Sequence, residues 1–397
     1  MRNVEAAGLE IGPDHPPRIM GVLNVSSESP YDPSVYDDPG EAAAYVDEEL
    51  IGEGADIVDV GLESANKDLD VLSAEGELAR LDTAVETLES TAGDAVWSIE
   101  TRYHEVADEA LSRGFDMVND ICGFADPEMP QVCREHDAAV SKMASPPDLE
   151  RPGAIEDVDE IYEALSMNGF TDKTIVDPAF GGWSAAKTHA DDRETFRRLR
   201  EFAGYGRPIL VSINRKSFLK TIAGRSTEEA LPVSLAATAM AVERGANVIR
   251  THDVAETRDA ALIGDALGAD VVTRDGTVTV RELDVQTPRE VRRRLDRLGA
   301  VAADVADASA VTTYELTGLS TAAAEALEAA TRTSGAAFAR GVPADEADAR
   351  PGQQAGRRDQ RGLLVGTAAE LAAVVETATG TSDALDEALR SVGPRRE

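Results

Sequence analysis

Residues 18–25 read RIMGVLNV and residues 55–61 read ADIVDVG, two short runs that are apolar at most positions. A strand with one face in water alternates apolar and polar residues, whereas a strand buried on both faces of a parallel sheet is apolar throughout. Both runs therefore predict buried parallel strands. Six further runs of this kind follow, at residues 95–101, 115–121, 138–143, 174–180, 208–214 and 246–252.

Amphipathic stretches rich in Ala, Glu and Arg separate these runs, among them residues 41–53, 72–90, 103–113, 192–202 and 233–244. Eight buried strands that alternate with helices over about 250 residues predict an α/β fold, a (β/α)8 TIM barrel. A doubly wound open sheet is the main alternative. Its dinucleotide-binding form is disfavoured because no GxGxxG motif follows the first strand.

The composition changes after about residue 267, where Ala, Thr, Arg and Asp dominate. The patterns there predict strands at 277–283, 311–316, 336–340 and 363–365, and helices at 288–298, 321–333, 368–377 and 382–391. Residues 341–361 are rich in Gly, Pro, Gln and Arg, which predicts a flexible loop. We therefore expect a barrel over residues 1–268 and a small α/β or α+β accessory domain over residues 269–397.

The 397-residue chain has 74 acidic and 39 basic residues, a formal net charge of -35 and only six lysines. The phosphates of a nucleic acid or of an anionic membrane would repel such a surface, so neither is an expected partner. Many acids with few lysines are typical of halophilic proteins, because concentrated salt screens the repulsion between like charges. An ordinary acidic protein is the alternative.

Two cysteines, Cys122 and Cys133, are too few for a disulfide framework, and neither lies in a CxxC or CxxH motif. The sequence has no signal-peptide pattern at its start, and no apolar run reaches the ~18 residues of a membrane span. We therefore expect a soluble, cytoplasmic protein.

Polar residues stand at the carboxyl end of nearly every predicted strand, where a barrel has its active site. In strand order they are Asn24, Asp59 with Glu63, Glu100, Asn119 with Asp120, Lys142, Asp177, residues 214–217, and Arg250 with His252. Polar side chains within apolar runs are costly to bury unless they are paired or used. Acids and amides dominate one side, and Lys216, Arg250 and His252 form a basic side. The implied ligand has a donor-rich face and an anionic tail.

Seven segments, in this order, resemble the motifs of dihydropteroate synthases: Ile19–Ser26, Gly54–Ser64, Ser98–Thr101, Val118–Ile121, Val176–Gly181, Asn214–Phe218 and Val248–Asp253. The resemblance implies a folate-pathway transferase that condenses 6-hydroxymethyl-7,8-dihydropterin pyrophosphate with p-aminobenzoate, giving 7,8-dihydropteroate and pyrophosphate. It also implies that the leaving group departs before the amine adds, that Mg²⁺ takes part, and that the protein is a homodimer.

The resemblance implies a role for each candidate residue by its motif position. Glu100, Asn119, Asp177 and Lys216 would bind the pterin, and Ser217 the aminobenzoate carboxylate. Asn24, Arg250 and His252 would hold the pyrophosphate, with Asn24 also a ligand of Mg²⁺. The catalytic candidates are Lys216, Asp177, Arg250 and His252. The alternative for each is a structural role, for example a Glu100 that pairs with Arg102.

Two loops depart from the family pattern. In the first, Glu28 stands at an acidic position and Pro30 replaces an aromatic residue. In the second, Ala65, Asn66 and Lys67 follow Glu63-Ser64, so the usual Thr and Arg are missing, and Lys is not equivalent to Arg at a bidentate site. Glu100 also replaces the usual Asp. A pterin enzyme with another acceptor (an arylamine variant or a methyltransferase type) and a non-catalytic pterin-binding paralogue therefore remain alternatives.

Overall fold

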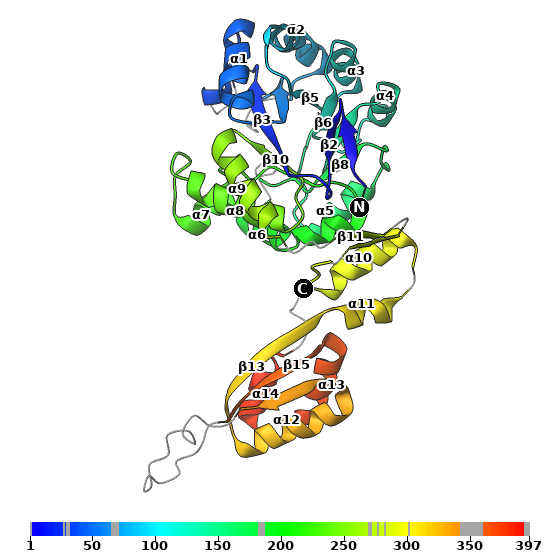
Figure 1. Cartoon of the computed structure of the whole chain (residues 1–397), viewed down its shortest axis with the longest axis vertical. Helices are drawn as coiled ribbons and strands as arrows, with labels where there is room; N and C mark the ends of the chain where they lie inside the picture. The colour runs from blue at the N-terminus through cyan, green and yellow to red at the C-terminus, as the bar shows by residue number, and fades with distance from the viewer. Residues whose placement is uncertain are drawn as a thin grey trace. The chain divides into compact units, whose positions relative to one another are not determined.

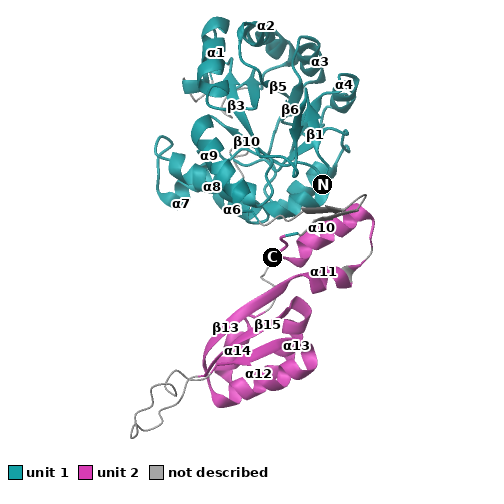
Figure 2. Cartoon of the chain, in the orientation of Figure 1, with its two compact units in different colours: residues 1–283 teal, residues 284–397 magenta. Residues whose placement is uncertain are grey.

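The computed structural model describes residues 2–26, 28, 32–64, 71–181, 187–268, 272–275, 278–281, 283–300, 302–341 and 360–392. The chain divides into two compact units, residues 1–283 and residues 284–397 (Figure 2). The sequence prediction ended the barrel at residue 268. The structure assigns the hairpin of β11 (Val272–Asp275) and β12 (Val278–Arg281), which lies beyond that point, to the first unit.

An eight-stranded parallel sheet forms the centre of the first unit, in the order β8-β7-β6-β5-β4-β3-β10-β9 (Figure 1). The strands are β3 (Arg18–Asn24), β4 (Ile57–Gly61), β5 (Val96–Thr101), β6 (Met117–Asp120), β7 (Ala139–Met143), β8 (Thr174–Asp177), β9 (Leu210–Val211) and β10 (Val248–Thr251). A parallel bridge between Val176 and Ile209 brings the two edges of the sheet together. The predicted (β/α)8 barrel is confirmed.

Helices follow the strands and cover the outside of the sheet (Figure 1). They are α1 (Pro39–Tyr45), α2 (Ala74–Ser90), α3 (His104–Ser112), α4 (Met129–Glu135), α5 (Val158–Ser166), α6 (His189–Arg197), α7 (Ser217–Ala223), α8 (Leu231–Glu243) and α9 (Val254–Ala266). A π-helical segment (Val46–Ile51) continues α1, and a 3-10 segment (Leu199–Tyr205) follows α6. Side-chain caps fix several helix starts, since Ser73 accepts the backbone N–H of Gly76 and Thr188 accepts that of Asp191.

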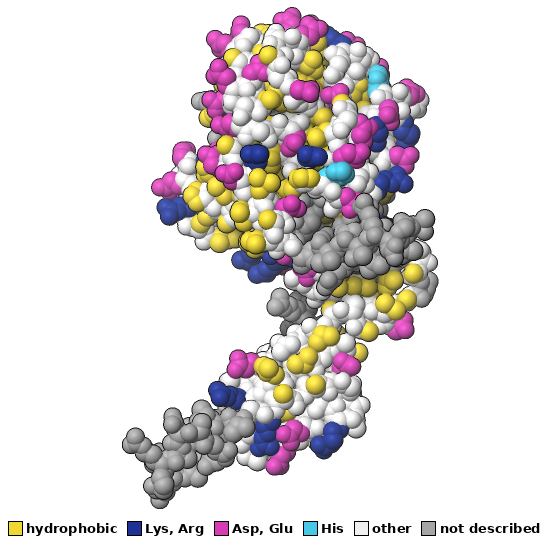
Figure 3. Space-filling model, in the orientation of Figure 1, with side chains coloured by type: hydrophobic (Ala, Val, Ile, Leu, Met, Phe, Trp, Pro, Cys, Tyr) yellow, Lys and Arg dark blue, Asp and Glu magenta, His cyan; other side chains and the backbone are white. Residues whose placement is uncertain are grey.

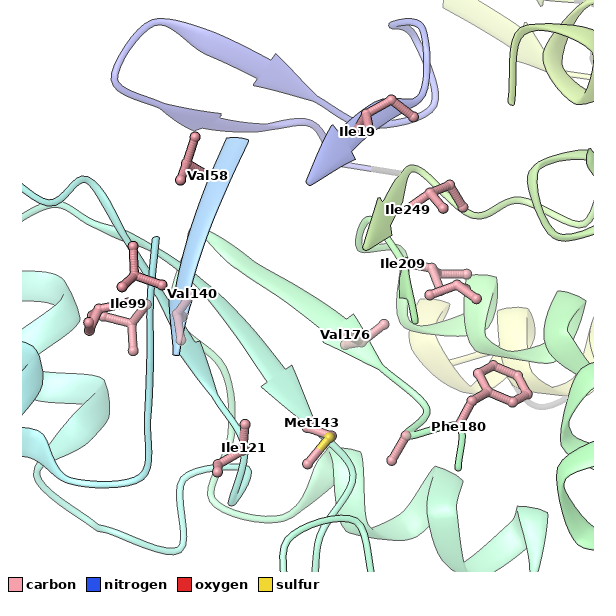
Figure 4. Packing of buried hydrophobic residues seen from close by; sticks show 14 of the residues in the cluster. Ile19, Val58, Ile99, Ile121, Val140, Met143, Val176, Phe180, Ile209 and Ile249 are labelled. Carbon is pink, nitrogen blue, oxygen red and sulfur yellow. The ribbon is translucent and has the colours of Figure 1, made fainter. Parts of the chain in front are cut away.

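Buried residues divide between the outside and the inside of the barrel wall. On β4, Val58 and Val60 belong to the large core between strands and helices, part of which Figure 4 shows, whereas Ile57 belongs to a smaller cluster inside the barrel. Because side chains alternate along a strand, Asp59 shares the inward orientation of Ile57. The same alternation brings Asn24, Glu100, Asn119, Asp177 and Arg250 into the barrel. Asp120 and Lys142, also predicted at strand ends, lie on the other face of their strands, where Lys142 Nζ donates to the Gly169 carbonyl at 2.9 Å.

A hairpin that the sequence analysis did not predict closes the amino-terminal end of the barrel. It consists of β1 (Val4–Ala6) and β2 (Leu9–Ile11), paired antiparallel. Val4, Ala6 and Ile11 are at most 2% exposed and pack in the inner cluster with Met20 and Ile57. The open end of the barrel is therefore the carboxyl end of the strands.

The second unit has a three-stranded antiparallel sheet in the order β13-β15-β14 and its own hydrophobic core around Leu327, Leu364 and Leu371. Its elements are α10 (Pro288–Leu298), α11 (Ala303–Ser309), β13 (Val311–Leu319), α12 (Thr321–Ser334), β14 (Ala337–Arg340), β15 (Gln360–Thr367), α13 (Ala368–Ala378) and α14 (Asp383–Leu389). The sequence analysis missed α11. Most of the predicted loop at 341–361 lies outside the described residues, and its last two residues begin β15.

None of the helices in the described part of the chain combines the length and apolar character that a bilayer span requires. The cytoplasmic location stays a prediction.

A buried carboxyl on α2 predicts pH-dependent stability. Glu77 is 1% exposed and accepts a hydrogen bond from the Thr101 hydroxyl, and burial raises its pKa to about 8. The ordinary value is 4.5, so the folded state binds this proton more tightly than the unfolded state does. Stability from this group is therefore lost as the pH rises from about 4.5 through 8.

Glu77→Gln replaces the protonated carboxyl with a neutral group of similar shape. We expect the variant to match the wild type near pH 4.5 and to exceed it by roughly 2–4 kcal/mol in unfolding free energy near pH 9. Urea unfolding at the two pH values measures this difference. A gap between the two proteins that is the same at both pH values would contradict the assignment.

Candidate active site

A cavity of about 170 Å³ opens at the carboxyl ends of the barrel strands. Its lining includes every predicted site residue except Ser217: Asn24, Glu100, Asn119, Asp177, Lys216, Arg250 and His252. Ile121, Met143 and Phe180 supply apolar lining, and Glu63, Ser212 and Asn214 add polar groups. Ser217, predicted to bind the aminobenzoate carboxylate, is the first residue of α7, but its side chain is exposed and the structure does not bring it into this cavity.

Arg250 is bonded to two carboxylates. Its Nε donates to Asp59 Oδ2 and its Nη2 donates to Glu100 Oε2, each at 2.7 Å. Burial opposes the charged form, but Glu100 and Asp59 hold the pKa of Arg250 above its ordinary value. Burial raises the pKa of Glu100, and Arg250 opposes this rise. Glu100 thus pairs with Arg250 and not with Arg102, whose guanidinium bonds Glu63.

Two amide side chains present oxygens to the cavity. Asn119 Nδ2 donates to Asp59 Oδ2 at 3.0 Å and to Glu100 Oε2 at 3.4 Å, which leaves Oδ1 as its ligand-facing acceptor. Asn214 Nδ2 donates to Asp253 at 2.8 Å, and its buried Oδ1 has no hydrogen-bond partner among the described residues. A ligand that offers N–H groups would complement both oxygens.

Asp177 is a buried acid, and Lys216 is a partly buried base. Burial raises the pKa of Asp177 to about 6, although the backbone N–H of Ala179 donates to its Oδ1 at 2.8 Å. Burial, together with Arg250, lowers the pKa of Lys216. The lysine passes so close to Gly181 that a Cβ there would lie 2.8 Å from Lys216 Cδ, and the φ of +103° at this position also favours glycine.

Asn24, Ser34 and His252 form a hydrogen-bonded chain. Asn24 Nδ2 donates to Ser34 Oγ at 3.1 Å, and that hydroxyl lies 3.1 Å from His252 Nδ1. Burial and the neighbouring Arg250 lower the pKa of His252 to about 3. His252 was expected to be one of the basic residues, but a pKa so far below its ordinary value makes the imidazole neutral at pH 7. It therefore acts as a hydrogen-bonding group.

The turn that carries Lys216 is held by Arg215, a residue to which the sequence analysis gave no role. Arg215 has a left-handed backbone (φ 50°) and its guanidinium makes a two-point contact with Asp253, at 2.9 and 2.8 Å. Asp253 is thereby fixed and in turn fixes Asn214. Asp59, Arg215 and Asp253 all stand in the quoted motifs, so their positions were visible in the sequence but their partners were not.

The loops after β3 and β4 are joined through Arg80 on α2. Arg80 Nη1 donates to Glu28 Oε1 at 2.6 Å and to the Leu62 carbonyl at 2.8 Å, and the Ser64 hydroxyl donates to the Glu28 carbonyl at 3.2 Å. The sequence analysis missed Arg80 because it lies outside every motif. Pro30, Ala65, Asn66 and Lys67 lie outside the described residues.

A group of metal-ligand types lies outside the cavity, where ligand atoms of His104, Glu105 and Asp126 fall within 4.8 Å of one another. His104 Nδ1 already bonds Asp126 Oδ2 at 2.8 Å and lies 3.2 Å from Glu105. Burial opposes protonation, but these carboxylates together raise the pKa of His104. The group is satisfied as an ion-pair cluster, and we assign it no metal.

The chain is similar to known pterin enzymes in sequence. A family model described as pterin binding enzyme matches residues 20–252. The dihydropteroate synthase of Bacillus subtilis is 30% identical over 255 residues, which cover 63% of this chain and 88% of that protein. A probable bifunctional folylpolyglutamate synthase/dihydropteroate synthase of Halobacterium salinarum is 34% identical, over 64% of this chain and 32% of that protein.

Solved structures agree with these sequence matches. The dihydropteroate synthase of Coxiella burnetii in complex with pteroic acid superposes with a TM-score of 0.57 at 28% identity, covering 66% of this chain and 98% of that one. The enzyme of Xanthomonas albilineans with 4-aminobenzoic acid gives 0.56 at 28% identity, covering 67% and 97%. The family model spans more than half of the chain, and the barrel supplies the cavity. The chain belongs to the pterin binding enzymes, in the dihydropteroate synthase family.

Proposed function

We propose that this chain is a dihydropteroate synthase, a transferase of folate biosynthesis. It joins p-aminobenzoate to 6-hydroxymethyl-7,8-dihydropterin pyrophosphate and releases pyrophosphate and 7,8-dihydropteroate. The observation that carries the proposal is the division of the cavity into two kinds of group. Asp177, Glu100 and Asn119 offer hydrogen-bond acceptors, and Lys216 and Arg250 are partly buried cations. This division complements the N–H groups of a pterin and the charge of a pyrophosphate.

In this mechanism Asp177 and Asn119 Oδ1 accept hydrogen bonds from pterin N–H groups, and Lys216 donates to the pterin carbonyl or ring nitrogen. Arg250 and neutral His252 hold the pyrophosphate. The bond between the pterin methylene carbon and the pyrophosphate oxygen breaks first, and its electron pair leaves with the oxygen. Fixed cations stabilise the charge that develops there. The amine of p-aminobenzoate then adds to the pterin-methyl cation and loses a proton, so no strong general base is required.

We also propose Mg²⁺ as a cofactor, with Asn24 as its protein ligand. Asn24 Nδ2 is committed to Ser34, which leaves Oδ1 as a neutral oxygen near the proposed pyrophosphate site. A Cβ on Gly61 would lie 2.8 Å from this oxygen, so the glycine leaves room for it. Mg²⁺ prefers oxygen ligands and is commonly shared between one or two protein groups and substrate phosphates. When bound, the ion would neutralise part of the pyrophosphate charge.

The experiment that tests the function is pyrophosphate release from hydroxymethyl-dihydropterin pyrophosphate, with and without p-aminobenzoate. The assay contains Mg²⁺ and multimolar KCl, because we propose from the net charge of -35 that the protein is adapted to salt. Release that requires the acceptor and yields dihydropteroate supports the proposal. Pterin binding without turnover would overturn the catalytic assignment and favour a binding paralogue or another acceptor. Absence of pterin binding would overturn the site.

We further propose a homodimer that pairs through the apolar surface of α7 to α9. Figure 3 shows hydrophobic side chains gathered in this region, and Ile222, Met240, Ile263 and Leu267 are 63%, 46%, 58% and 77% exposed. Exposed apolar side chains gathered on one face are typical of protein interfaces. Light scattering in multimolar KCl is expected to give twice the chain mass, and Ile263→Asp is expected to give the monomer. A wild-type monomer would contradict this proposal.

A further inference from the structure

We propose that Asp59, which does not line the cavity, is a positioning residue. It fixes the orientation in which the Asn119 amide and the Arg250 guanidinium face the ligand. The inference rests on the proposed function, since it concerns the pterin side of the same cavity. The Asp59 carboxylate is fully buried, with an exposed fraction of 0%. Burying a carboxylate costs free energy unless both of its oxygens accept hydrogen bonds. The donors that bond to Asp59 therefore indicate which groups it orients.

Three strands reach Asp59 through side chains. Ser98 Oγ on β5 donates to Oδ1 at 2.7 Å. Asn119 Nδ2 on β6 and Arg250 Nε on β10 donate to Oδ2, at 3.0 and 2.7 Å. Asp59 itself belongs to β4, so one carboxylate joins four strands directly beneath the ligand-facing groups. Both Asn119 and Arg250 line the cavity, whereas Ser98 does not.

The first consequence concerns the polarity of Asn119. Its amide nitrogen faces two carboxylates, those of Asp59 and Glu100. The reversed amide would direct its oxygen at the same two carboxylates and would be repelled. Asp59 therefore fixes Asn119 Oδ1 as an acceptor, and the cavity selects a ligand N–H at this position over a ligand carbonyl.

The second consequence concerns Arg250. With Nε on Asp59 and Nη2 on Glu100, the Nη1 group is the part of the guanidinium without a partner in the described residues. The side chain thus presents one fixed N–H₂ group and cannot rotate without breaking charged hydrogen bonds. Asp59 also offsets the positive charge of Arg250, which otherwise opposes the charge on Lys216.

The test compares Asp59→Asn with Asp56→Asn, the same substitution on the same stretch of chain. Asp56 precedes β4 and accepts the backbone N–H of Ile19 at 2.9 Å, at the opposite end of the barrel from the cavity. We expect Asp59→Asn to weaken pteroate binding about 10–100-fold, because it removes charged hydrogen bonds that orient Asn119 and Arg250. We expect Asp56→Asn to bind pteroate within about twofold of the wild type.

If Asp59 only stabilised the fold, its effect on pteroate affinity would be the same with and without the Asn119 side chain. In an Asn119→Ala background, we expect the loss caused by Asp59→Asn to shrink at least about threefold, since the acceptor that it orients is absent. Ser98→Ala is the milder variant to use where Asp59→Asn does not fold. It keeps the Asp59 carboxylate but removes the hydrogen bond to Oδ1, and we expect pteroate binding to weaken several-fold.

Wild-type pteroate affinity in Asp59→Asn, or an equal loss with and without Asn119, would overturn the inference. Where Asp59→Asn does not fold, unchanged affinity in Ser98→Ala would also overturn it. Failure of the wild type itself to bind pteroate would instead overturn the proposed function, so the two failures are distinguishable.

Discussion

Asp177→Ala and Lys216→Ala are each expected to lower turnover by about 10²–10³-fold or more while the chain stays folded. Each removes a group that contacts the pterin in the proposed mechanism. Burial raises the pKa of Asp177 and lowers that of Lys216, so the charged form of each is unfavourable in this cavity. Ionisable groups whose pKa is shifted by burial are typical of functional sites. Because the alanine variants no longer bury a charged group, we expect them to stay folded.

Steady-state rates and thermal melting measure the two effects separately. Lys173→Ala is a matched control for Lys216, because Lys173 pairs with Glu5 and Asp137 and does not line the cavity. We expect the control to keep its rate. Near-wild-type turnover in either cavity variant would remove that residue from the catalytic assignment.

Arg250→Ala is expected to be the most damaging substitution for both stability and activity. It leaves the buried carboxylates of Asp59 and Glu100 without their cation. Removing one partner of a buried ion pair costs about 3–5 kcal/mol, because the charge that remains is uncompensated. Turnover is expected to be lost as well, since Arg250 is the cation proposed for the leaving pyrophosphate.

A second substitution separates the two effects of Arg250→Ala. Adding Glu100→Gln removes one of the unpaired charges, so the double variant should regain part of the unfolding free energy but none of the activity. Urea unfolding and the pyrophosphate assay measure these outcomes. An Arg250→Ala protein within about 1 kcal/mol of the wild type would contradict the electrostatic account of this pair.

The fold was largely predictable because the sequence pattern that indicates each strand lies within a few neighbouring residues. Each barrel strand is a short apolar run whose period is visible in a few residues, and each of the eight predicted strands is present. The hairpin β1–β2 was missed because three-residue strands carry too little pattern. The boundary at residue 268 rested on a change of composition, whereas the structural division depends on contacts that composition does not report.

Most residues of the cavity were predictable from the sequence, Ser217 being the exception, but the hydrogen-bonded pairs among them were not. Strand ends converge in a barrel, so Asn24, Asn119 and Asp177 could be expected together. The bond between Arg250 and Asp59 joins residues 191 positions apart, and no spacing in the sequence reports it. The neutral state of His252 depends equally on burial and on a neighbouring guanidinium. Arg80 was missed for the same reason, since its partners lie on two other loops.

The hairpin beneath the barrel has a kinetic consequence. Because β1 and β2 fill the amino-terminal end with Val4, Ala6 and Ile11, both reactants enter and both products leave through the same mouth. In a cavity that is open at one end, a ligand bound at the bottom must bind before a ligand nearer the opening and must dissociate after it. For the proposed reaction we therefore expect an order of addition, with the pterin first and the arylamine second.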